Sequence, residues 1–113
     1  MLIYKILTAG QWAQLRRDGQ SAGAPVDMAD GFVHFSSRSQ VAGTAVKHFA
    51  GQDGLTLVAV EAGTLGDALR WEPSRDGDLF PHLYGPLRMG DAAWTCALLL
   101  GPDGAHVFPE RVS

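Results

Sequence analysis

A histidine inside an apolar strand marks the first candidate site of this sequence. The string DGFVHFSS covers residues 30–37 and places His34 just before Ser36 and Ser37. An imidazole exchanges a proton near neutral pH, and the free amides and hydroxyls at a helix start bind anions such as phosphate. We predict that His34, Ser36 and Ser37 form one half of a ligand site. The simpler interpretation is a buried histidine beside two helix-capping serines.

A second histidine lies in an unusual string, FPHLYG, at residues 80–85. His82 stands between two aromatic residues, Phe80 and Tyr84, in a segment that also contains proline and glycine. Aromatic rings stack on planar ligands, and segments constrained by proline and glycine present them in a fixed geometry. The string predicts a second binding half centred on His82. The alternative is a hydrophobic cluster beneath a loop.

Three charged residues near these strings are further candidates. Glu72 follows Trp71 and is suited to act as an acid, a base or an acceptor for a ribose hydroxyl. Arg75 lies in the turn string SRDGD, where its guanidinium can hold a phosphate through two N–H donors. Asp30 can orient His34, cap a helix or begin a turn. Each also has a plainer interpretation as an exposed charge at a strand end or turn.

The common catalytic and metal-binding motifs are absent from the sequence. The chain has no GxGxxG, P-loop, HExxH or GxSxG string, and its cysteine and histidine spacing matches no zinc site. Cys96, the single cysteine, lies in an apolar strand where an inert thiol is expected. His48 and His106 are interpreted as surface or structural residues. We therefore expect no metal in the site.

Hydrophobic patterning predicts the strands that must hold these residues. Apolar and β-branched residues alternate or run on at residues 2–7, 31–35, 55–61, 70–72, 92–100 and 105–108. The run at 55–61 is apolar on both faces, which indicates a central strand. Within 31–35, Phe32 and His34 should face one way, and Val33 and Phe35 the other.

Helical spacing predicts two main helices. The first extends from residue 9 to about 18, and the second carries an apolar stripe of Val41, Ala42, Ala45, Val46 and Phe49. The first helix is expected to begin after the N-cap Thr8 and to end at Gly19. The second is expected to begin after the N-cap Ser36 or Ser37 and to end at Gly51. A single helical turn is expected at 64–69. Residues 19–30 are predicted as a loop, 74–78 as a turn, and 79–84 as irregular or extended.

The order strand, helix, strand, helix and then mostly strands indicates an α+β fold rather than a regular βαβ array. The 113 residues, 46% apolar, suit a single domain with one core. The formal charge of −3 with scattered basic residues does not indicate a nucleic-acid partner. No apolar run reaches the roughly 18 residues of a membrane span. The absence of a disulfide and of a signal peptide fits the cytoplasm, and the oligomeric state is left open.

Nearly the whole chain resembles the bacterial "domain of unknown function 952" family. The resemblance rests on IYKIL with Trp12, DGFVHFSS, the helix with Gln40 and Thr44, LTLVAVE, Trp71-Glu72 and FPHLYG. It implies a fold similar to the ADP-ribosyltransferase fold, with split mixed or antiparallel β-sheets and a cleft for NAD. It also implies that His34 and Ser36 resemble the element that contacts a ribose hydroxyl, and that His82 resembles the second histidine of the RNA 2′-phosphotransferase branch. Phe35 stands where that superfamily has glycine, and Glu72 is the candidate for its catalytic glutamate.

Three functions follow as hypotheses. The first is an NAD-directed enzyme in which His34 and Ser36 hold a ribose or phosphate, Phe80 or Tyr84 stacks on nicotinamide, and His82 positions the acceptor or leaving group. The second is a metal-independent phosphodiesterase with two histidines as acid and base. The third is a non-catalytic module that binds a nucleotide or a protein. NAD is thus expected as a substrate or ligand.

Overall fold

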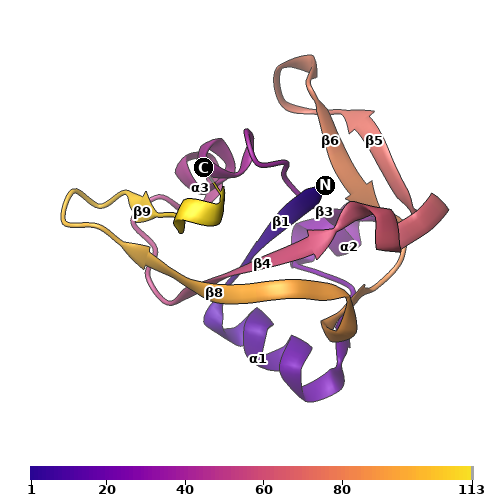
Figure 1. Ribbon diagram of the computed structural model, residues 1–113, viewed down its shortest axis with the longest axis horizontal. Helices are drawn as coiled ribbons and strands as arrows, with labels where there is room; N and C mark the ends of the chain where they lie inside the picture. Colours follow the sequence, from indigo (N-terminus) through magenta and orange to yellow (C-terminus); the bar gives the residue numbers. More distant parts are fainter. Residues whose placement is uncertain (113) are drawn as a thin grey trace.

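Four antiparallel strands form the larger sheet, in the order β1-β4-β8-β9 (Figure 1). The computed structural model describes residues 1–112, with the side chain of Arg75 outside the described part. The strands are β1 (Leu2–Leu7), β4 (Leu55–Glu61), β8 (Ala92–Leu100) and β9 (His106–Val107). The strands predicted at 2–7, 55–61 and 92–100 are confirmed, and β4 is central as predicted. The final strand is shorter than the predicted 105–108.

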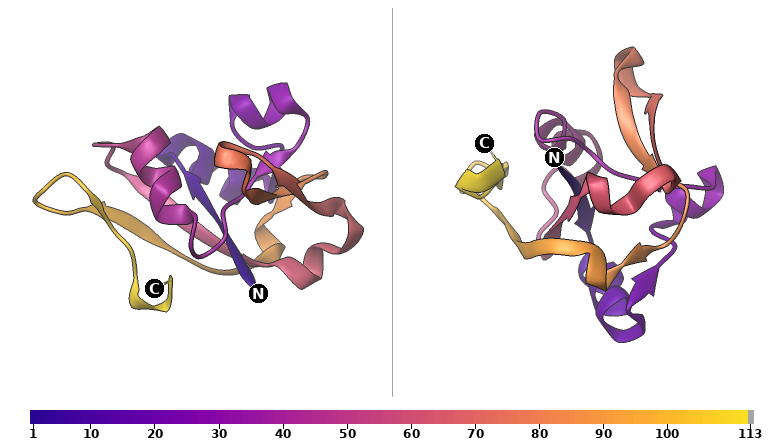
Figure 2. Two further views of the ribbon diagram at one scale, coloured as in Figure 1. Left: turned by 90° about the horizontal axis from the view of Figure 1, so that it is seen from above. Right: turned by 45° about the vertical axis from the view of Figure 1, so that its right-hand side comes forward.

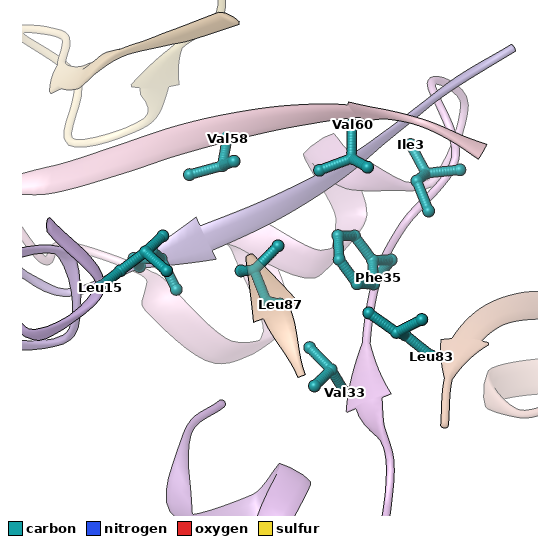
Figure 3. Packing of buried hydrophobic residues seen from close by; sticks show 9 residues of the cluster. Ile3, Leu15, Val33, Phe35, Val58, Val60, Leu83 and Leu87 are labelled. Carbon is teal, nitrogen blue, oxygen red and sulfur yellow. The ribbon is translucent and has the colours of Figure 1, made fainter. Parts of the chain in front are cut away.

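Two hydrophobic clusters fill the two sides of this sheet. The first joins β1 and β4 to α1 (Ala9–Asp18) and to the three-stranded sheet described below, which is called the smaller sheet. Its members are Ile3, Leu7, Leu15, Val33, Phe35, Val58, Val60, Leu83 and Leu87 (Figure 3). The second lies against α3 (Val41–Phe49); its members are Tyr4, Ile6, Val41, Ala45, Leu55, Leu57, Ala59, Leu98 and Val112. Accordingly, α1 and α3 lie on opposite sides of the larger sheet (Figure 2).

The first helix has the predicted boundaries because its end residues satisfy its free backbone groups. The backbone N–H of Gln11 donates to Thr8 Oγ1 at 3.3 Å, and the backbone N–H of Thr8 donates to Gln11 Oε1 at 3.0 Å. This reciprocal capping box fixes the start of α1. Gly19 ends it in the left-handed conformation, at φ 76°.

A three-stranded antiparallel sheet, in the order β3-β6-β5, carries the two histidines. It consists of β3 (Val33–His34), β6 (Leu79–Leu83) and β5 (Leu69–Pro73). The edge strand predicted at 70–72 is confirmed and is longer, whereas the strand predicted at 31–35 is shorter. The segment predicted at 79–84 as irregular or extended is extended, and its residues Leu79–Leu83 form the central strand of this sheet. Pairing with β3 on one side and β5 on the other holds this segment in a strand despite Pro81, which has no N–H to donate. The carbonyl of Pro81 still accepts the N–H of Phe35 at 3.0 Å.

The loop predicted at residues 19–30 is wrong. The segment contains β2 (Gln20–Ser21), which pairs with β7 (Leu87–Arg88), and a short helix, α2 (Pro25–Asp30). Proline suits the first helical position because its missing N–H needs no partner there. Asp27 accepts the N–H of Ala24 at 2.7 Å, and Gly31 ends the helix at φ 85°. A helix of six residues is too short to show a hydrophobic period in the sequence.

The second predicted helix is confirmed as α3, but its predicted cap is not. Neither Ser36 nor Ser37 caps it through its hydroxyl; Gln40 is the N-cap, without a side-chain bond to the helix. Ser36 Oγ instead contacts Thr44 Oγ1 at 2.7 Å, which ties the end of β3 to α3. Val46 is 71% exposed and so does not belong to the buried stripe.

Short 3-10 helices make up the remaining connections. The helical turn predicted at 64–69 overlaps the 3-10 helix Ala62–Ala68, and its last residue, Leu69, begins β5. The SRDGD turn contains Arg75–Gly77, and the others are Met89–Asp91 and Glu110–Val112. Within residues 1–112, no helix has the length and apolar character needed to cross a membrane. The expected α+β class with antiparallel sheets is confirmed, and α2 adds a third α-helix to the two predicted.

Candidate functional site

The two predicted halves of the site lie side by side on one sheet face. His34 on β3 and His82 on β6 are register partners, and their ring centroids are 5.4 Å apart. Directly opposed residues of antiparallel strands point to the same face, while their sequence neighbours point away. Val33 and Phe35 accordingly pack into the first core cluster, as predicted. The pairing of β3 with β6 therefore brings together residues 48 positions apart in the sequence.

His34 is held by two carboxylates from the short helix α2. Its Nδ1 lies 2.6 Å from Asp27 Oδ1, and its backbone N–H donates to the same oxygen at 2.9 Å. Its Nε2 lies 3.0 Å from Asp30 Oδ2. Asp30 thus contacts His34, one of the roles proposed from the sequence, but it contacts the outer nitrogen. The buried partner that fixes the ring is Asp27, and the sequence did not predict a contact between Asp27 and His34.

Asp27 is 1% exposed and forms the hub of the His34 half. Its Oδ2 accepts a hydrogen bond from Lys5 Nζ at 2.8 Å. Burial raises the pKa of Asp27, but the hydrogen bond from His34 and the charge of Lys5 outweigh it and bring the pKa to about 2. Burial lowers the pKa of Lys5, against the opposing effect of Asp27. The sequence signal that could have indicated this part of the site is Pro25, two residues before Asp27, because a proline followed by an acidic residue marks the start of a helix.

His82 has its own carboxylate on the neighbouring strand β5. Its Nδ1 lies 2.8 Å from Glu72 Oε1, and the Tyr84 hydroxyl donates to the same oxygen at 2.7 Å. Hydrogen bonds from Tyr84 and His82 lower the pKa of Glu72, and the bond to Glu72 raises the pKa of Tyr84. His82 is 4% exposed, and its Nε2 is buried with no hydrogen-bond partner among the described residues.

Phe32 joins the two histidines into one aromatic cluster. Its ring stacks on His82 with centroids 4.1 Å apart at 21°, and it lies 4.5 Å from His34 and 5.2 Å from Tyr84. The sequence pattern placed Phe32 on the face of His34 but gave it no role. These contacts restrict the rotation of both imidazoles, which is how a preorganised site holds its reacting groups.

Both histidines line a cavity of about 440 Å³ between the smaller sheet, β1 and α3. Its walls are Tyr4, Lys5, Ile6, Ala24, Val26, His34, Phe35, Ser36, Thr44, Lys47, His48, Phe49, Ser74, Phe80 and His82. These described lining residues include two lysines and three histidines but neither aspartate nor glutamate. A cavity with this lining favours a ligand that carries negative charge. Its size falls in the range of small-molecule sites.

The remaining predicted site residues are distributed around this cavity. Ser36 and Phe80 line it, while Glu72 and Tyr84 lie behind and beside His82. Ser37 borders a second depression with Arg38 and Gln40. The side chain of Arg75 lies outside the described residues.

His48 and Lys47 on α3 also line the cavity, although neither of them was assigned a site role from the sequence. His48 is exposed, as predicted, yet lies at this cavity. Across residues 1–112, no group of three or more histidine, cysteine or acidic side chains is arranged to hold a metal ion. The expectation of a metal-free site stays a prediction.

The comparisons with known proteins concern the fold and the family. The model of a family described as proteins of unknown function, DUF952, matches residues 6–95. The crystal structure of protein CC0527 from Caulobacter crescentus is 44% identical, with a TM-score of 0.94 over 99% of this chain and 98% of that chain. Its solution NMR structure is 47% identical, with a TM-score of 0.83 over 92% of this chain and 90% of that chain. No curated protein matches the chain.

Proposed function

The chain belongs to the DUF952 family, and we propose that it binds an NAD- or ADP-ribose-like nucleotide in the two-histidine cavity and acts on it as an ADP-ribosyltransferase-like enzyme. One observation carries this proposal. The rings of His34 and His82 lie 5.4 Å apart and line one cavity, each with Nδ1 against a carboxylate. Two oriented imidazoles facing one volume are equipped to bind a polar substrate and to transfer a proton.

The lining of the cavity suits the charge and the rings of a nucleotide. Lys47 supplies positive charge and no described lining residue is acidic, while Lys5, also in the wall, is paired with Asp27. Phe80 and Phe49 supply aromatic walls on which a planar base can stack. Tyr84, the other stacking candidate, is fixed against Glu72 and Phe32, so we assign the stacking role to Phe80.

The two halves of the site have different tasks in this proposal. His34, fixed by Asp27, and Ser36 hold a ribose hydroxyl or a phosphate. The ribose hydroxyl would replace Asp30 at His34 Nε2, an exchange that the 47% exposure of the Asp30 side chain permits. Phe35, which stands in place of the superfamily's glycine, buries its ring in the core, away from His34.

His82 serves the transfer itself. In ADP-ribosyl transfer, the bond between ribose C1′ and the nicotinamide nitrogen breaks, a bond from C1′ to the acceptor oxygen forms, and the acceptor loses its proton. With Nδ1–H donating to Glu72, the unpaired His82 Nε2 is the acceptor for that proton. Glu72 is then a positioning residue. A related phosphotransfer would use the same nitrogen.

Isothermal titration calorimetry with NAD and ADP-ribose tests the binding. We expect wild-type protein to bind at least one of them, and His34→Ala and His82→Ala to weaken binding about tenfold or more, since each removes a polar ligand contact. His106→Ala is the matched control, because His106 bonds to Gln52 away from the cavity. Absence of binding by wild type at millimolar ligand would refute the proposal.

Product analysis separates the enzyme from the other two hypotheses. Release of nicotinamide from NAD, lost in His82→Ala, supports transfer. Binding without turnover, with affinity unchanged in Glu72→Ala, supports a non-catalytic module instead. Hydrolysis of a 2′,3′-cyclic nucleotide, lost in both histidine variants, supports a phosphodiesterase. The second His-x-hydroxyl element of such an enzyme would use Tyr84, whose hydroxyl donates to Glu72.

A further inference from the structure

Tyr4 on β1 lies on the same face as the site histidines. Its backbone N–H donates to the carbonyl of Ser36 at 2.7 Å, and the N–H of Ser36 donates to the carbonyl of Tyr4 at 2.8 Å. Residues that exchange both bonds stand directly opposite each other, with side chains on one face. Ser36 follows His34 by two positions, so strand alternation places His34, Ser36 and Tyr4 on that face. All three line the cavity.

The hydroxyl of Tyr4 has no hydrogen-bond partner among the described residues. Tyr4 is 1% exposed, and its Oη is buried without a hydrogen bond to any described residue. The nitrogen His82 Nε2 in the wall of the same cavity is in the same condition. Buried polar groups are almost always hydrogen-bonded, and exceptions often mark functional sites. Two such groups at one cavity indicate that its occupant supplies their partners.

Packing alone does not explain a tyrosine at this position. The ring of Tyr4 packs in the second core cluster, with its centroid 5.9 Å from that of Trp94. Phenylalanine would make the same ring contacts without burying a polar atom. The hydroxyl therefore needs an explanation outside the core, and the cavity offers one.

We propose that Tyr4 is a ligand-binding residue whose Oη donates a hydrogen bond to an anionic oxygen of the nucleotide, on one of its phosphate groups. This inference rests on the proposed function and assigns the phosphate end of the ligand to the wall formed by β1 and α3. A phosphate oxygen only accepts hydrogen bonds, so the phenol donates. Lys47 lines the same cavity and supplies positive charge for the phosphate.

The test compares Tyr4→Phe with wild type by calorimetry with ADP-ribose. We expect affinity to fall about tenfold, the effect of losing one hydrogen bond to a charged group. Thr95→Val, which removes a hydroxyl from β8, a strand without described residues in the cavity wall, should leave affinity unchanged. Near-ultraviolet circular dichroism should show an intact fold in both variants. Equal affinity of Tyr4→Phe and wild type would overturn the inference and leave the proposed nucleotide binding standing.

A smaller probe separates this inference from the proposed function. If wild type binds neither NAD nor ADP-ribose, the proposed function fails, and inorganic pyrophosphate becomes the probe. A pyrophosphate-induced NMR shift of the His82 ring that is weakened in Tyr4→Phe would still support the contact between Tyr4 and an anion. No response of wild type to pyrophosphate, or an equal response in both proteins, would overturn it.

Discussion

Asp27 fixes the orientation of the first histidine because it is buried between Lys5 and His34. It lies 2.8 Å from Lys5 Nζ and 2.6 Å from His34 Nδ1. A carboxylate in this position fixes the ring orientation and favours a proton on Nδ1, as carboxylate–histidine pairs in active sites do. Lys5 has a structural role as well as a place in the cavity wall, since it offsets the buried charge of Asp27.

We predict that Asp27 makes folding stability depend on pH in the acid range. Its folded pKa of about 2 lies below the ordinary value of 3.8, so the folded protein binds this proton less readily than the unfolded chain. The contribution, about 2 kcal/mol, is present above about pH 4 and is lost as the pH falls through 2. Carbon NMR titration of the Asp27 carboxyl group, together with urea unfolding across this range, measures both quantities.

Replacement of the carboxylate separates this effect from general acid unfolding. In Asp27→Asn, the part of the stability loss at low pH that comes from Asp27 should vanish. The free energy of unfolding near neutral pH should fall by about 3–5 kcal/mol, because the buried Lys5 loses its counter-charge. Asp67→Asn, at an exposed position, should behave like wild type. An Asp27 pKa near its ordinary value, or the same acid loss in Asp27→Asn as in wild type, would contradict the prediction.

At the scale of elements, α1 shows how local sequence sets the boundaries of a helix. Thr8 and Gln11 satisfy the first amides, and Gly19 accepts a positive φ that other residues avoid. These signals involve neighbours in the chain, so the sequence revealed them. β6 depends on pairing with strands distant in sequence, β3 and β5, so its own residues predicted only an irregular or extended segment around Pro81.

Gly10 inside α1 and Gly19 at its C-terminal end should respond to alanine in opposite directions. Gly10→Ala should raise stability by about 0.5 kcal/mol, since a Cβ there meets nothing within 4 Å and alanine favours helix. Gly19→Ala should lower stability by about 1 kcal/mol, since φ is 76° at the helix end. Denaturant midpoints at constant m-value check both changes. Equal shifts in the same direction would contradict this account.

At the scale of the molecule, the site lies where the smaller sheet meets the larger one. The first core cluster joins both sheets through Ile3, Phe35 and Leu83 (Figure 3). The bridge between Tyr4 and Ser36 continues that junction along the backbone. The cavity wall therefore takes residues from β1, β6 and α3, whose relative positions depend on the whole core.

Amide hydrogen exchange should show that the centre of the larger sheet is more stable than its edge. Amides of β4, paired on both sides and buried, should exchange only through global unfolding, whereas those of β9, a two-residue edge strand, should exchange by local opening. With ADP-ribose, protection should increase in β3 and β6 and stay constant in α1. Ligand-dependent protection confined to α1 would place the site elsewhere.

The sequence by itself determined the strands β1, β4 and β8, the helices α1 and α3, and the two histidine strings, because patterning, capping and residue type are local properties. The pairing of His34 with His82 and the contact of Glu72 with His82 joined residues that the sequence had already selected. Asp27 and the unpartnered hydroxyl of Tyr4 came only from the tertiary structure. Their roles depend on burial and on partners far away in the chain, and no local pattern records either.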